Sequence, residues 1–586
     1  MSRKKKSVTP VVIEAAQPER LNRRDKYILL IMTAVYALAA FLNLGTLCFP
    51  ESAYTAGENE QITVRFSGEV EIETVYINTG IGEGTIIFCT ETDEPVSYAA
   101  DEGEMFQWKT YSPGFSPTDR LWLTVEEGLT VNEIAFLDAD GLVLSCEAEG
   151  GLGAALFDEP DTVPEAPSYF NGMYFDEIYH ARTAYEFLHT MSVYEWTHPP
   201  LGKLLIAVGI VIFGMNPFGW RFMGALFGVA MLPLMYIFAK RIFKRTDYAL
   251  LAAGLLCVDC MHFTQTRIAT IDVFAVFFIM LMFFFMYEFL RKPYMETSLR
   301  EQLRSLLLCG ISFGLGCSAK WIGCYAGAGL AVLLFYRLFG EYAAARREKR
   351  QQIFFKKTVS VLLHCCAFFV LIPGILYYLS YIPFYRYEAS VYSDYSFKDT
   401  FTTLIQEQEG MYAYHSNLTA THLCQSSWYQ WPLISKSVWF YVASVYNKIS
   451  NISSTGNPAV WWVSAVLSVC LLLERIMKKI KADRELPVLF IGIAANYLPW
   501  MLVSRCVFLY HFFATLPFMI LSGVYLLMHL EESNPRLRRV KWVWLAAALV
   551  YFILLFPAIS GIPAGTAYAG FLENILPGGY LYYGWA

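Results

Sequence analysis

The sequence predicts a polytopic α-helical membrane protein of about eleven transmembrane helices, with a small extracytoplasmic β-sandwich inserted after the first helix. Hydrophobic residues make up 56% of the 586 residues and charged residues only 16%, which is typical of a membrane protein and not of a soluble domain. Apolar runs of about 20 residues, long enough to cross a bilayer, recur along the chain. Between residues 55 and 150 they give way to short runs of alternating polar and apolar residues.

The first predicted span, 27–49, follows a basic segment at the N-terminus. This apolar run is too long for the core of a signal peptide and has no small-residue cleavage site, so we expect a retained anchor. The other predicted spans are 220–239, 247–263, 271–290, 303–317, 320–339, 358–382, 458–474, 486–503, 507–529 and 542–560.

Basic clusters set the orientation of the chain, because cytoplasmic loops are enriched in Lys and Arg. The clusters hold 32 of the 45 basic residues and lie at 1–26, 240–245, 291–304, 337–357, 475–484 and 536–541. Consecutive clusters are separated by two spans each, provided that the short apolar stretch 201–215 does not cross. We therefore predict a cytoplasmic N-terminus, an extracytoplasmic tail from about 561, and an amphipathic or re-entrant helix at 201–215 on the outer interface.

The insert at 55–150 has the period-two alternation of a small antiparallel β-sandwich. Cys89 and Cys146 lie in this exported segment, where disulfides are permitted, and the sequence leaves open whether they pair. Most other cysteines lie in apolar segments, where a thiol behaves as a small hydrophobe. We predict no metal site from them.

Polar residues capable of chemistry gather on the predicted outer side. Asp176 and Glu177 could deprotonate or position a hydroxyl, but Asp176 could instead cap a helix, with Glu177 a favourable acid in its first turn. His198 and Lys203 flank a Pro-Pro step, where a cation at headgroup depth suits a phosphate. A packed His and a Lys extended along apolar surface are the alternative.

Further charged residues lie at the predicted outer ends of spans, where they are costly and usually face a cavity or a partner. The basic residues Arg221, Arg267, Lys320, Arg505 and His511 are candidates for binding an anionic lipid headgroup. Asp272, five residues after Arg267, is a further candidate for substrate binding. A structural salt bridge between Arg267 and Asp272 is the alternative for that pair. Tyr414 and His415 belong to an aromatic-rich outer segment that could bind a sugar face or anchor the chain at the interface.

Five motifs containing these residues resemble those of the protein O-mannosyltransferases, specifically the bacterial branch that uses polyprenyl-phosphate-mannose. They lie, in family-like order, at 175–177, 198–203, 216–221, 267–272 and 505–511. The resemblance covers about 170–586 and the first span, and it implies a GT-C glycosyltransferase fold. The insert at 55–150 is a departure from simpler members; by pattern it looks like a jelly-roll carbohydrate-binding module.

The resemblance implies roles for individual residues. Asp176 would be the base that deprotonates a Ser or Thr hydroxyl, Glu177 would support it and bind the acceptor, and Arg221 would be an essential donor-site residue. The candidates for the lipid-phosphate and sugar pocket are His198, Lys203, Arg267 and Arg505. The implied reaction inverts the anomeric centre and needs no covalent intermediate. The donor substrate is the lipid-linked mannose, and the sequence leaves open whether a divalent ion is required.

The predicted protein is a multi-pass cell-membrane enzyme with an extracytoplasmic active site. Its expected partners are the lipid-linked donor, unfolded or translocating Ser/Thr-containing proteins and the protein export machinery; nucleic acid is not expected. The predicted segments are a basic cytoplasmic N-terminus (1–26), the first span (27–49), the insert and linker (50–165), the outer loop with the carboxylates (166–219), two helical regions (220–382 and 458–560), the aromatic-rich loop (383–457) and the outer tail (561–586).

Two alternatives remain at this stage. One is a transferase of the same fold and donor class that modifies a lipid or a cell-wall glycopolymer. The other is a transporter or flippase, which is disfavoured because transporters commonly show internal repeats and charges at the midplane of the membrane.

Overall fold

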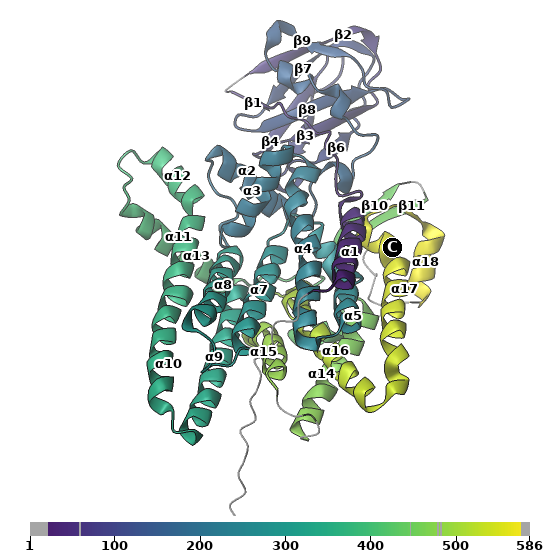
Figure 1. Ribbon diagram of the computed structural model, residues 1–586. Coiled ribbons are helices and arrows are strands. Elements are labelled where there is room, and N and C mark those ends of the chain that lie inside the picture. Colours follow the sequence, from purple (N-terminus) through teal and green to yellow (C-terminus); the bar gives the residue numbers. More distant parts are fainter. Residues whose placement is uncertain (1–20, 58–59, 446, 478–479, 481–482, 576–586) are drawn as a thin grey trace, which may run out of the picture.

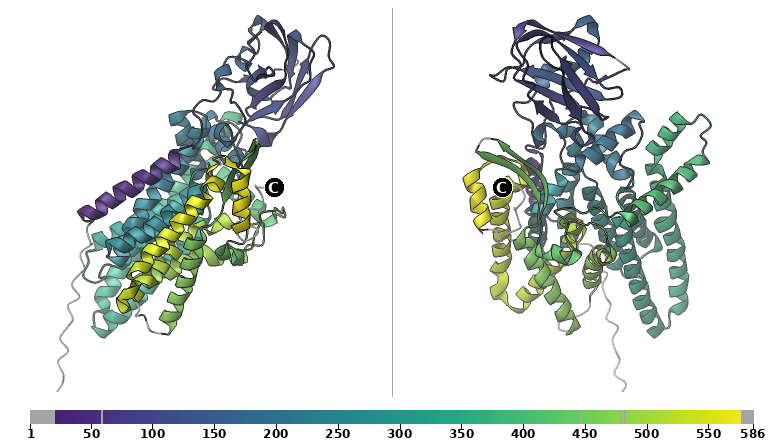
Figure 2. Two further views of the ribbon diagram at one scale, coloured as in Figure 1. Left: turned by 90° about the vertical axis from the view of Figure 1, so that its right-hand side faces the viewer. Right: turned by 180° about the vertical axis from the view of Figure 1, so that it is seen from behind.

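The computed structural model describes residues 21–57, 60–445, 447–477, 480 and 483–575, and consists of a helical bundle with a β module at one end (Figure 1). The predicted N-terminal cluster up to residue 20 and the tail from 576 lie outside the described residues. The β module projects from the same end of the bundle in the two further views (Figure 2). It follows α1 (Arg23–Phe41) and precedes α2 (Glu177–His189) in the chain.

The β module, residues 54–148, consists of two antiparallel sheets ordered β1-β8-β3-β6 and β5-β4-β7-β2-β9. Its strands are β1 (Tyr54–Thr55), β2 (Gln61–Val70), β3 (Thr74–Thr79), β4 (Gly84–Cys89), β5 (Val96–Ala100), β6 (Trp108–Tyr111), β7 (Thr118–Val125), β8 (Thr130–Leu137) and β9 (Cys146–Ala148). Alternate residues of β2, among them Ile62 and Val64, enter an apolar core that both sheets share. The predicted antiparallel sheets are therefore present.

Cys89 and Cys146 are both free thiols. Cys89 ends β4 and Cys146 begins β9, and strands β7 and β2 lie between them in the sheet. Three interstrand spacings amount to about 14 Å, whereas a disulfide requires Cα atoms less than about 7 Å apart. The sheet order thus excludes the pairing that the sequence left open.

The helical bundle matches the predicted spans by position. Within the described residues, seven helical segments are long and apolar enough to cross a membrane. Helices α5 and α6, which are bent by 59° at a short break, would form an eighth. The bundle helices are α4 (Pro217–Phe243), α5 (Thr246–Cys257), α6 (Cys260–Thr266), α7 (Asp272–Leu290), α8 (Leu299–Ala319), α9 (Ile322–Arg347), α10 (Gln351–Cys366), α11 (Ile372–Ser380), α14 (Pro458–Ile476), α15 (Glu485–Tyr497), α16 (Leu516–Ser533) and α17 (Val540–Ser560). Helices α1, α8 and α16 overlap the predicted spans 27–49, 303–317 and 507–529 but do not meet the same criterion. Helix α1 ends at Phe41, before the predicted end of the first span, and α16 begins only at Leu516.

The stretch predicted not to cross forms α3 (Leu201–Phe213). Its 13 residues extend only about 20 Å, which is too short for the hydrocarbon core of a bilayer. A side chain at Gly209 would collide with the carbonyl oxygen of Gly219, so the lack of a side chain lets α3 approach the start of α4 closely. Helix α3 lies beside α2 at the module end of the bundle (Figure 1).

The segment predicted as an aromatic-rich loop, 383–457, contains regular structure. It includes α12 (Ile382–Val391), α13 (Asp399–Asn417) and a hairpin of β10 (Val438–Val445) and β11 (Lys448–Ser454), to which β12 (Ala564–Gly565) adds a short third strand before α18 (Thr566–Ile575). Helix α13 is half polar, so an apolar-run criterion does not detect it.

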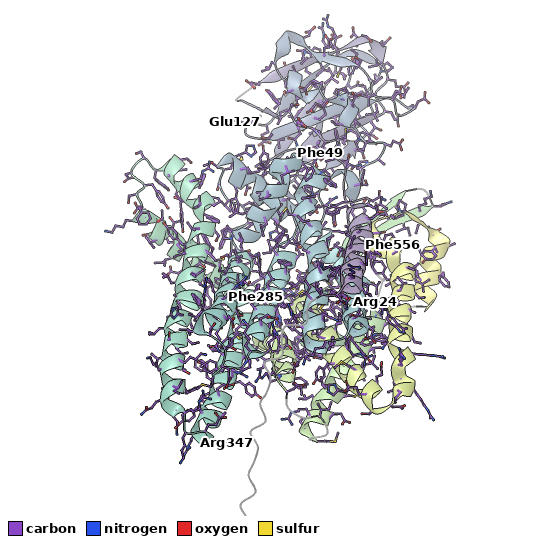
Figure 3. All side chains as sticks on the ribbon, in the orientation of Figure 1. Arg24, Phe49, Glu127, Phe285, Arg347 and Phe556 are labelled. Atoms are coloured by element: carbon purple, nitrogen blue, oxygen red, sulfur yellow. The ribbon has the colours of Figure 1, made fainter. Side chains whose placement is uncertain are left out.

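The basic turns between helices lie at the end of the bundle opposite the β module, as Arg347 shows in Figure 3. Ion pairs tie helices together at this end: the Lys541 ammonium on α17 lies 2.9 Å from Glu531 of α16, and Arg245 bonds both Asp247 and Glu531.

Candidate active site

Asp176 lies immediately before α2, in a segment whose backbone is constrained. Phe175 has a left-handed backbone with φ of 50°, which is unfavourable for a bulky residue, and its ring stacks on Phe440 with centroids 4.3 Å apart. Asp176 itself has helical dihedral angles, and its carboxylate accepts no capping hydrogen bond from the helix. Asp176 therefore occupies the N-cap position of α2 but does not cap the helix with its side chain.

Glu177, which follows Asp176 in the chain, forms a buried ion pair with Arg221. Both side chains are fully buried, and two parallel N–H···O bonds of 2.7 Å join them. The other donors of Arg221 bond the carbonyl oxygens of Leu44, Tyr169 and Gly172, at 2.7–2.9 Å. All five guanidinium N–H groups are thus engaged.

Glu177 also accepts hydrogen bonds from Trp220 Nε1 at 3.2 Å and from the Ala269 backbone N–H at 3.0 Å. The ion pair consequently fixes the start of α2 against α4 and against the turn that precedes α7. Neither Glu177 nor Arg221 offers an unengaged polar group to a substrate in this arrangement.

Asp272 is paired with Lys320, which enters from the end of α8. The Lys320 ammonium lies 2.9 Å from each carboxylate oxygen of Asp272. The proposed salt bridge between Arg267 and Asp272 is therefore wrong. The helix break at 267–271 directs Arg267 the other way, where it bonds the carbonyl oxygens of Ala40, Leu42 and Asn43 at the end of α1.

The Asp272–Lys320 pair acts electrostatically on Asp176. Part of the Asp176 side chain is accessible, but the surrounding protein limits its solvation, and this burial raises its pKa to about 7. The negative charge of Asp272 raises the pKa further, the Lys320 ammonium lowers it, and Glu195 raises it. Asp176 thus titrates near neutral pH, in the range suited to a general base.

Glu195, which the sequence analysis missed, organises the next cluster. Its carboxylate lies 2.6 Å from Lys203 Nζ and 3.0 Å from His198 Nδ1. Burial raises the pKa of Glu195, but Lys203 and His198 outweigh it and hold the pKa well below its ordinary value. The signal available in the sequence was an acid three residues before His198.

Lys203 is fully buried, and its ammonium also bonds the carbonyl oxygens of Glu195 and His198. Its ammonium is therefore engaged within the fold, where it fixes the 195–198 turn. His198, in contrast, remains partly accessible.

A cavity of about 490 Å³ brings four of the predicted residues together. His198, Lys320, His415 and Arg505 line it, along with aromatic residues such as Trp500. Burial, and then the nearby charges of His198 and Arg505, lower the pKa of His415 to about 4, so His415 is neutral at pH 7. Lys320 and Arg505 are the fixed cations of this lining.

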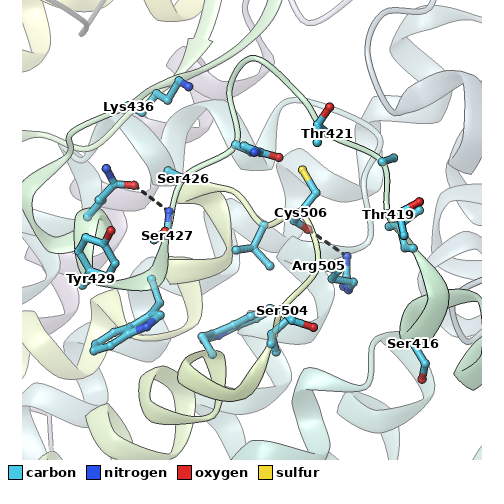
Figure 4. Close-up of a pocket in the computed structure, with 18 residues that line it drawn as sticks. Ser416, Thr419, Thr421, Ser426, Ser427, Tyr429, Lys436, Ser504, Arg505 and Cys506 are labelled. Carbon is cyan, nitrogen blue, oxygen red and sulfur yellow. Dashed lines mark hydrogen bonds between the residues drawn. The ribbon is translucent and has the colours of Figure 1, made fainter.

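Arg505 lies where this cavity meets a second one of about 780 Å³, shown in Figure 4. The second cavity is lined mainly by polar residues of 416–430 and 503–507. In the described structure, Arg505 donates one hydrogen bond, 3.4 Å long, to the carbonyl oxygen of Cys506. Among the predicted basic residues, its guanidinium is therefore the one most open to an anion.

The remaining predicted residues lie outside both cavities. His511 is buried against Trp500, with ring centroids 4.4 Å apart, and its Nδ1 contacts the Phe508 backbone. Tyr414 is 41% exposed and packs edge-on against Trp196. The described positions of Asp176, Glu177, Lys203, Arg221, Arg267 and Asp272 also lie outside the linings of these two cavities.

Two family models match the chain in succession. Residues 167–385 match the model described as dolichyl-phosphate-mannose-protein mannosyltransferase. Residues 400–569 match the model for the C-terminal four-transmembrane region of protein O-mannosyltransferase. The β module lies before both matches.

Similar proteins include two bacterial enzymes named polyprenol-phosphate-mannose–protein mannosyltransferase. The Mycolicibacterium smegmatis protein is 26% identical over 445 residues, covering 66% of this chain and 84% of the relative. The Mycobacterium tuberculosis protein is 25% identical over 453 residues, covering 66% and 83%. The Saccharomyces cerevisiae protein O-mannosyltransferase Pmt1–Pmt2 complex bound to the sugar donor has a similar fold, with a TM-score of 0.60 at 16% identity over 69% of this chain and 89% of that chain.

Proposed function

We propose, since the chain belongs to the protein O-mannosyltransferase family, that it transfers mannose from polyprenyl-phosphate-mannose to Ser or Thr hydroxyls of exported proteins, with inversion at the anomeric carbon. The observation that carries the proposal is the carboxylate of Asp176. It makes no capping hydrogen bond to α2, and its pKa of about 7 is influenced by the charges of the Asp272–Lys320 pair. Lys320 of that pair also lines the cavity of about 490 Å³, where it and Arg505 supply positive charge.

Asp176 is the proposed general base. Its ionised carboxylate accepts the proton of the acceptor hydroxyl while the hydroxyl oxygen forms a bond to the anomeric carbon. The bond from that carbon to the phosphate oxygen breaks, and the electron pair leaves with the polyprenyl phosphate. A pKa near 7 keeps a large fraction of Asp176 ionised at neutral pH and still lets it hold the proton that it accepts.

Glu177 and Arg221 are positioning residues in this proposal. Their buried ion pair holds the start of α2, so it sets where the Asp176 carboxylate lies without contacting either substrate. Lys203 is also a positioning residue in this proposal, because it holds the turn that carries His198.

The phosphate of the donor is proposed to lie near Arg505 and Lys320. Arg505 has N–H groups available for a phosphate oxygen, and a guanidinium can bind phosphate through two parallel bonds. Charge that develops on the leaving phosphate would be stabilised by cations already in position, which is a large contribution to catalysis in a poorly solvated site.

The orientation of the chain is part of the proposal. We place Asp176, α3 and the β module outside the cytoplasmic membrane, with eleven spans in a GT-C arrangement. The position of the basic turns at the opposite end of the bundle from the β module supports this orientation. In this orientation α3 lies at the outer interface, at the depth where a lipid phosphate is found.

Transfer assays with purified protein and radiolabelled polyprenyl-phosphate-mannose test the proposal. Asp176→Asn should lower transfer to a Ser/Thr peptide by about 10²- to 10⁴-fold without loss of donor binding. Asp394→Asn, an exposed acid between α12 and α13, serves as the matched control and should behave as wild type. Intact transfer in Asp176→Asn would refute the base assignment, and transfer to a glycopolymer but not to peptides would refute the acceptor assignment.

A further inference from the structure

Three carboxylates converge where the β module meets the segment leading to the active-site loop. Glu133 lies on β8, and Asp158 and Glu159 follow the module in the chain. One oxygen atom from each lies within 4.8 Å of the others. None of these residues belongs to the proposed transfer site.

Glu133 has a carboxylate oxygen that no protein group satisfies. The residue is fully buried, and its Oε1 has no hydrogen-bond partner, whereas its Oε2 accepts only a 3.3 Å bond from the Glu159 N–H among the described residues. A buried carboxylate normally has a paired cation, hydrogen bonds or a metal ion. The fold thus buries a carboxyl oxygen without a partner beside two further carboxylates.

The other two carboxylates are each held from one side. Glu159 Oε2 accepts bonds from the backbone N–H groups of Glu51 and Ser52, both 2.8 Å long. The Ser52 hydroxyl lies 2.8 Å from Asp158 Oδ1. Among the described residues, Asp158 Oδ2 and Glu159 Oε1 have no donor, so both remain available as ligands.

No basic residue of the described β module neutralises this cluster. Arg65 and Arg120 pair with Glu149, and Lys109 pairs with Glu104. They are the three Lys and Arg residues between positions 50 and 165. Burial, and to a lesser extent the charges of Asp158 and Glu159, raises the pKa of Glu133 to about 9, so that without a cation its carboxyl is neutral at pH 7.

We propose that Glu133, Asp158 and Glu159 bind a Ca²⁺ ion. The ligand atoms are hard carboxylate oxygens, which Ca²⁺ prefers, and their irregular arrangement suits its flexible coordination better than the strict octahedron of Mg²⁺. Solvent can complete the coordination because Asp158 is exposed.

Such an ion would connect β8 with the linker at 158–159. Residues 51–52, in the segment between α1 and the β module, would join through their hydrogen bonds to Asp158 and Glu159. Both chain connections between the β module and the helical bundle would thereby be fixed at one point. The site is expected to hold the module in one orientation above the bundle.

Calcium binding to the full-length protein in detergent, after removal of metals with EDTA, tests this proposal. Equilibrium dialysis with ⁴⁵Ca²⁺ should give one ion per chain, with a Kd of about 10⁻⁴ to 10⁻³ M as in other extracellular modules. Glu133→Gln and Asp158→Asn should each weaken binding at least about tenfold, because each removes one of three charged ligands. Asp119→Asn, an exposed acid on β7 of the same module, is the matched control and should bind as wild type.

A second measurement separates a metal ligand from a merely structural carboxylate. In EDTA at neutral pH, Glu133→Gln should melt close to the temperature of wild type, because the raised pKa of Glu133 already keeps its carboxyl neutral without the ion. Added Ca²⁺ should raise the melting temperature of wild type but not that of Glu133→Gln. Asp158→Asn keeps the test decisive if Glu133→Gln does not fold, because Asp158 is at the surface. The proposal is overturned if wild type does not bind Ca²⁺, or if Asp158→Asn binds it as tightly as wild type.

Discussion

The pH dependence of transfer should respond in opposite directions to the removal of the two partners in the Asp272–Lys320 pair. Lys320 lowers the pKa of Asp176 and Asp272 raises it. In wild type, kcat/KM should rise with pH as Asp176 loses its proton, with a midpoint near pH 7. Lys320→Met should therefore move this midpoint to higher pH. Asp272→Asn should move it to lower pH, since less of the base is then protonated at a given pH.

The size of the shift follows from Coulomb's law. A unit charge about 10 Å away contributes roughly 1.7 kcal/mol at an effective dielectric constant of about 20. One pKa unit corresponds to about 1.4 kcal/mol, so each variant should shift the midpoint by about one pH unit. In the double variant the two effects should largely cancel.

The assay is the initial rate of mannose transfer to a Ser/Thr peptide, at donor and peptide concentrations below their KM values, from about pH 5 to pH 9. Under these conditions the profile reports ionisation of the free enzyme. Asp394→Asn controls for a general effect of removing an acid from the outer surface. The reasoning is refuted if both single variants shift the midpoint in the same direction, or if neither shifts it.

Three further predictions concern the site and its support. Arg221→Met should lower the stability by about 3–5 kcal/mol, because it leaves Glu177 buried and unpaired, and a thermal-unfolding curve with an unchanged midpoint would contradict this. Arg505→Ala should weaken binding of polyprenyl phosphate about tenfold or more, since removal of a charge-assisted bond costs about 1.5–3 kcal/mol. The melting temperature should stay within about 2 °C of wild type. Unchanged inhibition of transfer by polyprenyl phosphate would argue against this prediction. Gly209→Leu should reduce the yield of folded protein because its side chain would collide with Gly219, whereas Gly340→Leu, at an open helical position, should be tolerated.

Much of the architecture could be predicted from local patterns. Apolar runs gave the positions of the bundle helices, and period-two alternation gave the antiparallel sheets, because each reflects how one element meets its surroundings. Loop charges identified 201–215 as a stretch that does not cross, and α3 is indeed too short to do so.

The partners of the charged residues could not be predicted in this way. Arg267 and Asp272 are close in sequence, yet the break between α6 and α7 separates them, and Lys320 reaches Asp272 from another helix. Arg221 looked like a donor-site cation, but its five N–H groups are all engaged in the fold. The sequence signal for Glu195 was only its place three residues before His198, and its importance follows from the contacts with Lys203 and His198 in the fold.

The place of Arg505 between two cavities has a consequence for the order of events in catalysis. One cavity has an aromatic and basic lining, and the other is mainly polar, so a lipid-linked sugar and a peptide have different suitable approaches to the same guanidinium. Neither substrate would then have to leave before the other arrives. Initial-rate plots at several fixed peptide concentrations should intersect, as for a ternary complex, and the spent polyprenyl phosphate should compete with the donor but not with the peptide.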